Sequence, residues 1–541
     1  PYMNDPDLIN NKVQQHEAME AARRVIPEVF AEFALLSGRN YASVDCYQMD
    51  DADVALVLLN SAAENAKEVV DRLREQGQKV GVVSPNVLRP FPTDEIRKIL
   101  KNVRAVVVGD RGDSYGAEGG NLSLEVRAAL QQDPDNRTLV LSRIYGLGGK
   151  DFYDTDAEEF FQEALQAART GTVDVPFEYH GAYAGDDGAG PPPGLPPIKS
   201  EEVSRGMATA TPNAETGRLE VELKPLWEMT TTPSRIAPGH GACPGCGFFP
   251  MLRQAYNVLE GNVVVLFQTG CAMVTTTGYP KTAHRVTYIH NLFQNGAATL
   301  SGLVEMYHER VRRGELPAMP EGEDTTFIMV TGDGGMDIGM GAALGTAHRN
   351  HRMIILEYDN QGYMNTGSQL SYSTPFGHRT STSEVGDARS GKRFHHKDTP
   401  QIFAACNLPY VFTASEGYPE DFMRKVAKAQ WYAQREGLVY GKVLSFCPLN
   451  WRTQDDAAQE VLQTAIDCCF FPLYEVEKGH TRLTYDPDAI GRRRAVGEWL
   501  GMMGKTKHIL APEHADQLEM TEQEVDKRWR RLKVKHEHPE L

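Results

Sequence analysis

The stretch TFIMVTGDGGMDIGMGAALGTAHRNHRMIILEYDNQG, residues 326–362, decides the fold. An apolar run at residues 326–331 is followed by a Gly-Asp-Gly-Gly turn, a helical pattern at residues 338–348 and a second apolar run at residues 353–358. Short apolar runs rich in aliphatic residues predict buried strands, and a strand, a helix and a strand in succession predict a parallel βαβ unit. The stretch therefore predicts an α/β fold.

The same alternation continues on both sides of this stretch. The further predicted strands cover residues 263–268, 410–413 and 442–446, and the further predicted helices cover residues 248–259, 295–313, 401–406 and 420–434. Strands that alternate with helices predict a parallel sheet covered on both faces, which is a doubly wound fold.

A second alternating region lies nearer the N-terminus. Its predicted strands cover residues 54–59, 79–83, 105–109 and 138–142, and its predicted helices cover residues 61–77, 94–100 and 122–130. Before it, residues 12–37 carry apolar side chains at helical spacing, which predicts a helix that ends at Gly38 and is kinked or restarted at Pro27. We therefore expect two doubly wound parallel-sheet domains.

Local composition marks the boundaries between these regions. Between about Gly181 and Ala214 the sequence is rich in Gly, Pro, Asp and Ser, which predicts a linker. After about Pro487 a helical pattern of mixed charge predicts a solvated or subunit-contacting tail. The expected regions are a connecting helical segment (1–50), a first α/β domain (51–180), a Gly/Pro-rich linker (181–232), a second α/β domain that binds cofactors (233–486) and a helical tail (487–541).

Overall composition excludes several classes of protein. The 541 residues include 56 Lys and Arg against 73 Asp and Glu, a formal net charge of −17, which repels nucleic acid and anionic lipid. No apolar run is long enough to span a bilayer, and no secretory signal is visible. Eight cysteines are too few for a disulfide framework. We expect a soluble protein of a reducing compartment, the cytoplasm, in which clustered cysteines are ligands.

Ligands of parallel sheets bind beyond the carboxyl ends of the strands, and four predicted strands of the second domain end in chemically informative residues. They are followed by Gly270-Cys271, Gly332-Asp333-Gly334-Gly335, Asp359-Asn360-Gln361-Gly362 and Cys447-Pro448. Asn360 lies 27 residues after Asp333, one helix and one strand further on, so the two side chains should lie on adjacent strand ends.

The pair Asp333 and Asn360 predicts a magnesium and diphosphate site. A carboxylate, an amide and a backbone carbonyl are the hard oxygen ligands that Mg²⁺ prefers, with diphosphate oxygens at the remaining positions. The glycines permit close approach of the diphosphate to the backbone, and the helix predicted from Ile338 directs its positive end toward it. This spacing resembles the thiamine diphosphate motif.

Four cysteines form the second candidate site. Cys243 and Cys246 form a Cys-x-x-Cys pair, which is compatible with a redox dithiol, half of a zinc site or part of an iron–sulfur site. Cys271 and Cys447 follow strands on the cofactor edge, so four thiolates can converge, and both a [4Fe–4S] cluster and a four-cysteine zinc site remain open. The remaining cysteines, namely Cys46, Cys406, Cys468 and Cys469, are expected to be inert thiols.

Several motifs together resemble the 2-oxoacid:ferredoxin oxidoreductases, and among them most closely the pyruvate:ferredoxin oxidoreductases. In the second domain they are the runs 239–247 (GHGACPGCG), 269–271 (TGC), 291–293 (NLF), 332–334 (GDG), 363–369 (YMNTGSQ), 374–377 (TPFG), 391–392 (GK), 397–398 (KD) and 445–448 (SFCP). The runs 38–41 (GRNY), 89–91 (RPF) and 145–151 (YGLGGKD) make the first domain similar to the transketolase C-terminal-like domain of that family.

The resemblance implies roles for individual residues. Cys243, Cys246, Cys271 and Cys447 match the ligands of a [4Fe–4S] cluster, which then outranks zinc. Asp333, Asn360 and the carbonyl of Gly362 match the Mg²⁺ ligands. Asn365 matches the catalytic asparagine that faces the thiazolium and substrate. The residues implied in cofactor binding are Cys271, Gly332, Asp333, Gly334, Gly335, Asn360, Gly362 and Asn365.

Two departures from the family pattern bear on the substrate. Where the family often has Gly-Gly-Gln, this chain has Gly367-Ser368-Gln369, and residues 291–295 (NLFQN) replace an acidic version of that segment. Both were expected near the substrate pocket, so a different 2-oxoacid, such as 2-oxoglutarate, is an alternative to pyruvate.

The resemblance also implies partners and a reaction. We expect a subunit of a complex that performs coenzyme A-linked oxidative decarboxylation of a 2-oxoacid, or the reverse carboxylation, with electrons leaving through the cluster to ferredoxin. The pyrimidine-binding domain of the family, and its coenzyme A-binding and ferredoxin-like domains, are not among these 541 residues, so partner subunits are expected to supply them. The alternatives are a non-oxidative thiamine-dependent decarboxylase or synthase and a non-catalytic electron-transfer subunit.

Overall fold

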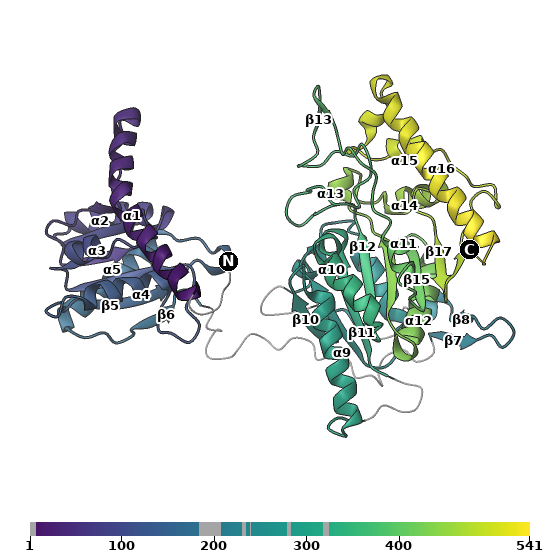
Figure 1. Cartoon of the computed structure of the whole chain (residues 1–541), viewed down its shortest axis with the longest axis horizontal. Helices are drawn as coiled ribbons and strands as arrows, with labels where there is room; N and C mark the ends of the chain where they lie inside the picture. The colour runs from purple at the N-terminus through teal and green to yellow at the C-terminus, as the bar shows by residue number, and fades with distance from the viewer. Residues whose placement is uncertain are drawn as a thin grey trace. The chain divides into compact units, whose positions relative to one another are not determined.

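The computed structural model describes residues 7–182, 207–229, 234–237, 240–277, 283–317 and 324–540. The chain divides into two compact units, Pro1–Gly188 and Ala189–Leu541, and each is described by itself (Figure 1). Each unit contains a mainly parallel sheet with helices packed on both faces. The predicted α/β class with two doubly wound sheets is therefore confirmed.

Unit 1 is built on a six-stranded sheet in the order β1-β3-β2-β4-β5-β6, in which only β1 pairs antiparallel, with β3. The strands are β1 (Val44–Tyr47), β2 (Val54–Val57), β3 (Val80–Pro85), β4 (Ala105–Asp110), β5 (Leu139–Ile144) and β6 (Phe177–Tyr179). The helices are α1 (Asp7–Ser37), α2 (Ser61–Glu75), α3 (Thr93–Leu100), α4 (Asn121–Gln131) and α5 (Asp154–Thr170), with a 3₁₀ turn η1 (Leu147–Gly149).

Alternate residues of the strands in unit 1 point into two cores. Val54 and Leu56 of β2 pack with α2 and α5, whereas Ala55 and Val57 pack with α3 and α4. This burial on both faces explains why the strands of the sheet interior are continuous apolar runs. Helix α1 runs without interruption through Pro27, so the restart that the proline suggested does not occur.

Unit 2 is built on an eight-stranded sheet in the order β10-β9-β11-β12-β16-β15-β17-β18, with β17 and β18 antiparallel at one edge. The strands are β9 (Val263–Gln268), β10 (Thr287–Asn291), β11 (Thr326–Gly332), β12 (Ile354–Asp359), β15 (Tyr410–Ser415), β16 (Val439–Leu444), β17 (Tyr474–Glu477) and β18 (His480–Leu483), and β13 (Val385–Gly386) and β14 (Arg389–Ser390) form a small hairpin. The helices up to β18 are α7 (Phe248–Val258), α8 (Cys271–Val274), α9 (Gly296–Arg312), α10 (Asp333–Arg349), α11 (Thr399–Ala404), α12 (Pro419–Arg435), α13 (Pro448–Trp451) and α14 (Ala458–Asp467).

The two faces of this sheet are covered by different helices. Ile328 and Val330 of β11 pack with α7 and α12, whereas Phe327 and Met329 pack with α9, α10 and α11. At the antiparallel edge, a buried ion network replaces apolar packing. Lys428 of α12 lies 3.0 Å from Glu475 and 3.3 Å from Glu477, and all three side chains are buried.

A β-hairpin occupies part of the range that the sequence analysis assigned to a linker. Strands β7 (Ala208–Pro212) and β8 (Leu219–Leu223) pair antiparallel, followed by the short helix α6 (Leu226–Met229). Leu219 is buried in the core beside α12, and its backbone N–H donates to Glu477 at 2.8 Å. The prediction of a linker is therefore wrong for residues 208–223, where the alternation of LEVEL is a strand pattern; residues 183–206 lie outside the described residues.

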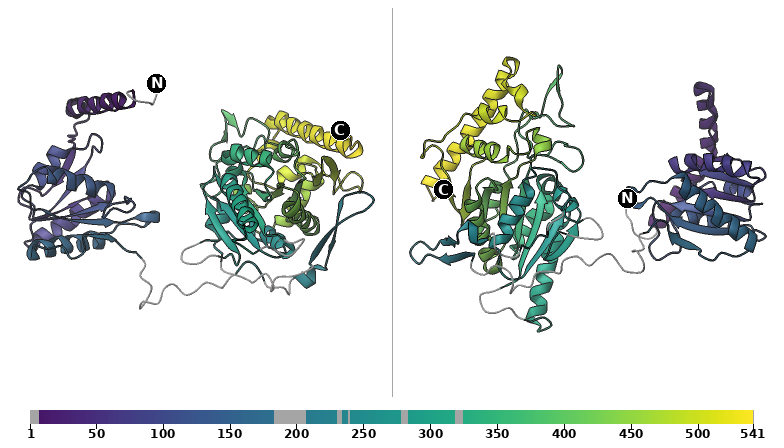
Figure 2. Two further views of the ribbon diagram at one scale, coloured as in Figure 1. Left: turned by 60° about the horizontal axis from the view of Figure 1, so that its bottom comes forward. Right: turned by 180° about the vertical axis from the view of Figure 1, so that it is seen from behind.

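The predicted tail is also part of unit 2. It comprises α15 (Val496–Gly501), the 3₁₀ turns η4 (Lys507–Leu510) and η5 (Pro512–His514), and α16 (Ala515–Glu537). Figures 1 and 2 show α16 lying along one side of unit 2. Trp499 and Trp529 share a core with Trp451 and Phe446, so a boundary at residue 487 divides one hydrophobic core. The tail is helical, as predicted, but it is not merely a solvated or subunit-contacting helix, because one face of α16 is buried in the core of unit 2.

Candidate cofactor site

All eight residues predicted to bind a cofactor line one cavity at the carboxyl ends of β9, β11 and β12. They are Cys271, Gly332, Asp333, Gly334, Gly335, Asn360, Gly362 and Asn365. The remaining wall includes Thr269, Phe293, Tyr358 and Tyr363. The structure therefore brings together residues that are up to 94 positions apart in the sequence, from Cys271 to Asn365.

Helix α10 begins at Asp333, five residues before the predicted start at Ile338. The glycines of the Gly-Asp-Gly-Gly run therefore belong to the first helical turn, where backbone N–H groups have no partner within the helix. Such a helix start favours a diphosphate through these donors and through the helix dipole. The backbone is crowded here, since a Cβ on Gly335 would lie 2.6 Å from Oγ1 of Thr331.

Three groups of the predicted magnesium site converge. One terminal atom of the Asn360 side-chain amide lies 3.1 Å from the carbonyl oxygen of Gly362 and 3.1 Å from Oδ1 of Asp333. If this atom is the amide nitrogen, it donates to both oxygens; if it is the amide oxygen, three oxygens meet without a hydrogen. The second arrangement is stable only around a cation, and carboxylate, amide and carbonyl oxygens are the donors that Mg²⁺ takes. The donor set therefore fits Mg²⁺.

Asp333 is held on its other side by a hydroxyl group. Oγ of Ser371 donates to Oδ2 of Asp333 at 2.5 Å, and Nζ of Lys397 donates to the Asp333 backbone carbonyl at 3.0 Å. Burial, together with the nearby carboxylate of Asp359, raises the pKa of Asp333 well above its ordinary value. A dication at this position would reverse that shift, because it stabilises the ionised carboxylate.

A layer of charged groups lies beneath the site. Nζ of Lys442 on β16 is 2.9 Å from Oδ2 of Asp359 and 3.4 Å from Glu357, both on β12. Lys442 also donates to Oγ of Ser373 at 3.0 Å. Lys442, Lys397 and Ser371 were not predicted as site residues, because each lies far from Asp333 in the chain and only the pairing of β12 with β16 brings Lys442 close.

The cavity is small in this chain alone, about 30 Å³. Tyr363 packs so closely on the start of α10 that a Cβ on Gly334 would lie 2.6 Å from its ring. Residues 363–366 form one wall of this cavity. Asn365 and Thr366 in this segment are exposed, so the segment is only partly held by packing.

The four predicted cluster cysteines lie near one another around the same sheet edge. Burial raises the pKa of Cys246 to about 11 and that of Cys271 to about 12, and the pKa of Cys447 is raised for the same reason. Other thiols of the group contribute to these shifts: Cys447 and Cys243 raise the pKa of Cys246, the same two and Cys246 raise that of Cys271, and Cys243 raises that of Cys447, so these thiols lie within electrostatic reach of one another. Iron or zinc removes the thiol protons on binding, so the thiol set fits a thiolate-bound metal group.

Cys243 and Cys246 also line an open cavity of about 820 Å³ together with Glu416. Oε1 of Glu416 accepts from the Phe446 backbone N–H at 2.7 Å, whereas Oε2 is buried with no partner among the described residues. Burial raises the pKa of Glu416 to about 8. A carboxyl group beside the thiols was not predicted, since Glu416 follows a strand that carries no other site residue.

The metal loop and the cysteine loop are hydrogen-bonded to each other. Cys447 caps α13, and from this helix Asn450 and Trp451 both donate to the carbonyl oxygen of Asn360, at 3.2 and 3.1 Å. Lys505, from the predicted tail, donates to Oε1 of Gln361 at 2.7 Å. Burial lowers the pKa of Lys505 to about 7, against the opposing effect of Cys447 and of Asp359 and Asp333.

The two departures from the family pattern lie mostly outside the cavity. Of residues 291–295 and 367–369, only Phe293 lines it within the described chain. Ser368 adopts a left-handed backbone with φ of 61°, which costs a non-glycine residue about 1–2 kcal/mol. That both departures lie near the substrate pocket stays a prediction.

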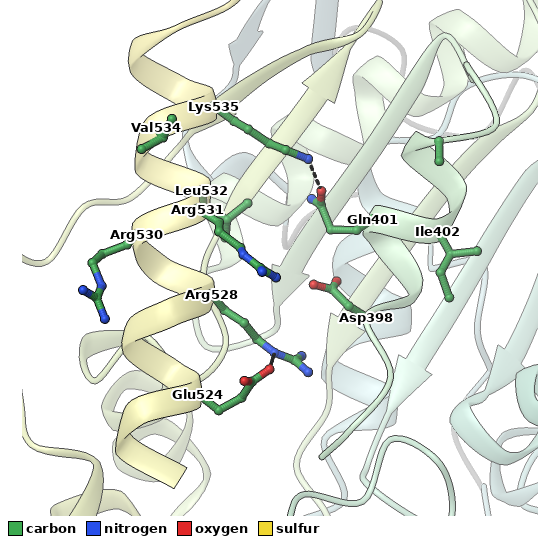
Figure 3. Close-up of a pocket in the computed structure, with 11 residues that line it drawn as sticks. Asp398, Gln401, Ile402, Glu524, Arg528, Arg530, Arg531, Leu532, Val534 and Lys535 are labelled. Atoms are coloured by element: carbon green, nitrogen blue, oxygen red, sulfur yellow. Dashed lines mark hydrogen bonds and ion pairs between the residues drawn. The ribbon is translucent and has the colours of Figure 1, made fainter. Parts of the chain in front are cut away.

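A larger groove of about 930 Å³ lies between α16 and the start of α11, and none of the predicted site residues lines it. Figure 3 shows Lys535 hydrogen-bonded to Gln401 and Arg528 paired with Glu524 along its walls. These groups satisfy one another, and we assign the groove no chemistry. Among the described helices, none combines the length and apolar character needed to cross a bilayer.

Two family models match the chain. A model described as pyruvate:ferredoxin oxidoreductase core domain II matches residues 52–157. A model described as the C-terminal thiamine pyrophosphate-binding domain of thiamine pyrophosphate enzymes matches residues 269–440. The second range contains the cavity and Cys271, so the fold and the site define a thiamine diphosphate-binding enzyme.

Curated relatives narrow this class. The chain is 40% identical over 276 residues to pyruvate synthase subunit PorB of Methanocaldococcus jannaschii, which covers 51% of this chain and 89% of the relative. It is 39% identical over 304 residues to the PorB subunit of Thermotoga maritima, which covers 55% of this chain and 90% of the relative. It is 31% identical over 297 residues to ketoisovalerate oxidoreductase subunit VorB of Pyrococcus abyssi, which covers 54% of this chain and 91% of the relative. The chain belongs to the 2-oxoacid:ferredoxin oxidoreductase family, as an oxidoreductase subunit.

Proposed function

We propose that this chain is the thiamine diphosphate-binding subunit of a pyruvate-type 2-oxoacid:ferredoxin oxidoreductase. The reaction is the coenzyme A-linked oxidative decarboxylation of a 2-oxoacid, or the reverse carboxylation. The observation that carries the proposal is the convergence of the Asp333, Asn360 and Gly362 oxygens beside four thiols at one sheet edge. A cofactor that reacts with the substrate and a group that accepts its electrons then lie side by side.

In the proposed site, the chain's residues bind and orient the cofactor. Asp333, Asn360 and the Gly362 carbonyl hold Mg²⁺, and the first turn of α10 binds the diphosphate. When bound, thiamine diphosphate supplies the carbanion that adds to the 2-oxo carbon. Asn365 lies on the exposed segment of the cavity wall, where its amide can donate to the substrate carboxylate or oxo group.

We also propose that Cys243, Cys246, Cys271 and Cys447 bind a [4Fe–4S] cluster. Among the described residues, no three His, Cys, Asp or Glu side chains are close enough to hold a single ion. The proposal of a [4Fe–4S] cluster instead of zinc rests on the match of these four positions to the cluster ligands of the family. The cluster gives electrons a route out, as an oxidoreductase requires.

The proposed partners follow from the chemistry and from the relatives, which are named as subunits. A partner subunit carries the pyrimidine-binding domain, and other subunits bind coenzyme A and carry ferredoxin-like clusters; ferredoxin is the external acceptor. Exposed apolar side chains near the site support a covering partner: Leu449 beside the cysteine loop is 70% exposed, and Leu292 is 54% exposed. The proposed location is the cytoplasm.

Pyruvate is the proposed substrate, because several of the relatives are pyruvate synthases, and the branched 2-oxoacid named for one relative is the second candidate. An anaerobic assay of the purified complex with a panel of 2-oxoacids, coenzyme A and a viologen acceptor decides between them. A higher kcat/KM for pyruvate than for 2-oxoisovalerate and 2-oxoglutarate supports the proposal. A higher kcat/KM for one of the other two acids would identify that acid as the substrate in place of pyruvate.

Metal content is the test of the cluster. We expect about four iron and four acid-labile sulfide per copy of this chain beyond the amounts bound by partner subunits, and their loss in Cys447→Ala. Cys468→Ala is the matched control, because Cys468 is a buried thiol that is not one of the four proposed ligands and lines neither cavity of the site. Zinc, or no metal, in the wild-type chain would overturn the oxidoreductase mechanism in favour of non-oxidative decarboxylation.

A further inference from the structure

Lys505 is a buried cation without an anionic partner in the described part of the chain. It lies between α15 and η4, and its side chain is 1% exposed. Its ammonium donates one hydrogen bond, to the neutral amide of Gln361 at 2.7 Å, and stacks over the ring of Trp451 at 4.8 Å. Burying an ammonium in this way is unfavourable unless negative charge compensates it.

The groups that face Lys505 show where that charge arises. Cys447, Asp359 and Asp333 act on it electrostatically. Asp359 is already paired with Lys442, and Asp333 already accepts from Ser371. Cys447 remains, and it lies at the N-terminus of α13, the helix whose Trp451 ring lies beneath the Lys505 ammonium. The charge of Lys505 is therefore matched when Cys447 is a thiolate ligand of a metal group.

The position of Lys505 is fixed from several sides. Its backbone carbonyl accepts from the Arg379 N–H at 3.1 Å. Gly504 lets this segment lie close to the end of α13, because a Cβ at position 504 would lie 2.8 Å from Cβ of Arg452, the residue directly after that helix. Trp451, over which the ammonium lies, in turn donates to the Asn360 carbonyl. Lys505 is therefore held against α13, the helix that Cys447 caps.

We propose that Lys505 is a positioning residue that raises the reduction potential of the [4Fe–4S] cluster by placing its ammonium beside Cys447. This inference rests on the proposed function. One-electron reduction adds one negative charge to the cluster, and a fixed cation stabilises the reduced form more than the oxidised form. The electron comes from oxidation of the 2-oxoacid and leaves to ferredoxin, and Lys505 exchanges no bond or proton. An anionic cluster also favours the protonated form of Lys505.

The test is the midpoint potential of this cluster in the anaerobically purified complex, followed by electron paramagnetic resonance during redox titration. The signal of this cluster is the one that is absent from Cys447→Ala. We expect Lys505→Met to shift its midpoint to lower potential, with iron content unchanged, and Lys505→Arg to stay near wild type. Lys507→Met is the matched control, because Lys507 is an exposed lysine two residues away.

The outcomes separate the two proposals. Equal midpoints for Lys505→Met and wild type, with full iron content, overturn the role of Lys505 and leave the proposed function intact. A wild-type chain without iron overturns the proposed function itself. If Lys505→Met fails to assemble, Lys505→Gln, which keeps a polar side chain, is measured in its place, and an unshifted midpoint there refutes the role equally.

Discussion

Replacement of Ser371 by alanine tests how Asp333 is prepared for the metal. The Ser371 hydroxyl donates to Asp333 at 2.5 Å and accepts from the backbone N–H groups of Ser373 and Thr374 at 3.1 Å each. A hydrogen bond to a charged group contributes about 1.5–3 kcal/mol. At 1.4 kcal/mol per factor of ten, the dissociation constant for Mg²⁺ and thiamine diphosphate should rise about 12- to 140-fold. Losses of 10- to 100-fold are typical for residues that orient a metal ligand.

The same substitution should change the pH dependence of cofactor binding. Donation by Ser371 lowers the pKa of Asp333, so its loss raises that pKa further. The metal requires the ionised carboxylate, so cofactor affinity falls as the pH falls. In the variant this fall begins at a higher pH than in wild type, and the difference in affinity between the two grows as the pH is lowered. Calorimetric titration of cofactor-free complex at several pH values measures both effects, with Ser381→Ala, an exposed serine, as the control. An affinity within twofold of wild type at every pH would refute this reasoning.

Three further predictions concern stability and cofactor access. The melting temperature of Glu416→Gln should rise relative to that of wild type as the pH rises from about 5 to 8. In wild type the folded state retains a proton on Glu416 (pKa about 8) that the unfolded state releases near 4.5, so wild type loses about 1.4 kcal/mol of stability per pH unit over this range, and the variant does not. A difference in melting temperature that does not depend on pH would exclude this cause. Lys428→Met should destabilise unit 2 by about 3–5 kcal/mol in calorimetry, since it leaves the buried Glu477 without a cation in the described chain, whereas Glu475 keeps Arg482; a loss below 1 kcal/mol would show that Glu477 is solvated. Gly335→Ala should weaken thiamine diphosphate binding at least tenfold in a fluorescence titration, because its Cβ would meet Thr331. Gly341→Ala is the control and should bind normally, because the space around its Cβ in the same helix is open. Equal affinities of the two variants would contradict the crowding argument.

Local pattern was sufficient for most of the fold. The apolar runs at 263–268, 326–331 and 353–358 are strands within one residue, because buried parallel strands need continuous apolar sequence. Strand β10 at one edge of the sheet, and β17 and β18 at the other, were not predicted, since their pattern mixes polar and apolar residues. Helix α10 begins earlier than predicted. Its first turn is rich in glycine, which is a poor helix former, so the sequence pattern did not indicate a helix there.

The candidate site, like the fold, could be predicted only in part. Residues that follow strands, such as Asp333, Asn360 and Cys271, could be placed at one edge from topology alone. Ser371 and Lys505 could not, because they lie in irregular segments whose position depends on tertiary packing. Their contacts with Asp333 and Gln361 exist only after the chain has folded, and no local pattern specifies them.

The single carbonyl of Asn360, which accepts from both Asn450 and Trp451, has a consequence for assembly. Any ligand that orders the 360–362 turn also orders the helix capped by Cys447, and the converse holds. If the proposed [4Fe–4S] cluster binds at Cys447, the cluster and thiamine diphosphate are thermodynamically linked, and linkage is reciprocal: the factor by which the cluster would tighten thiamine diphosphate binding equals the factor by which thiamine diphosphate would tighten binding of the cluster. Oxidative loss of one cofactor should therefore begin the release of the other.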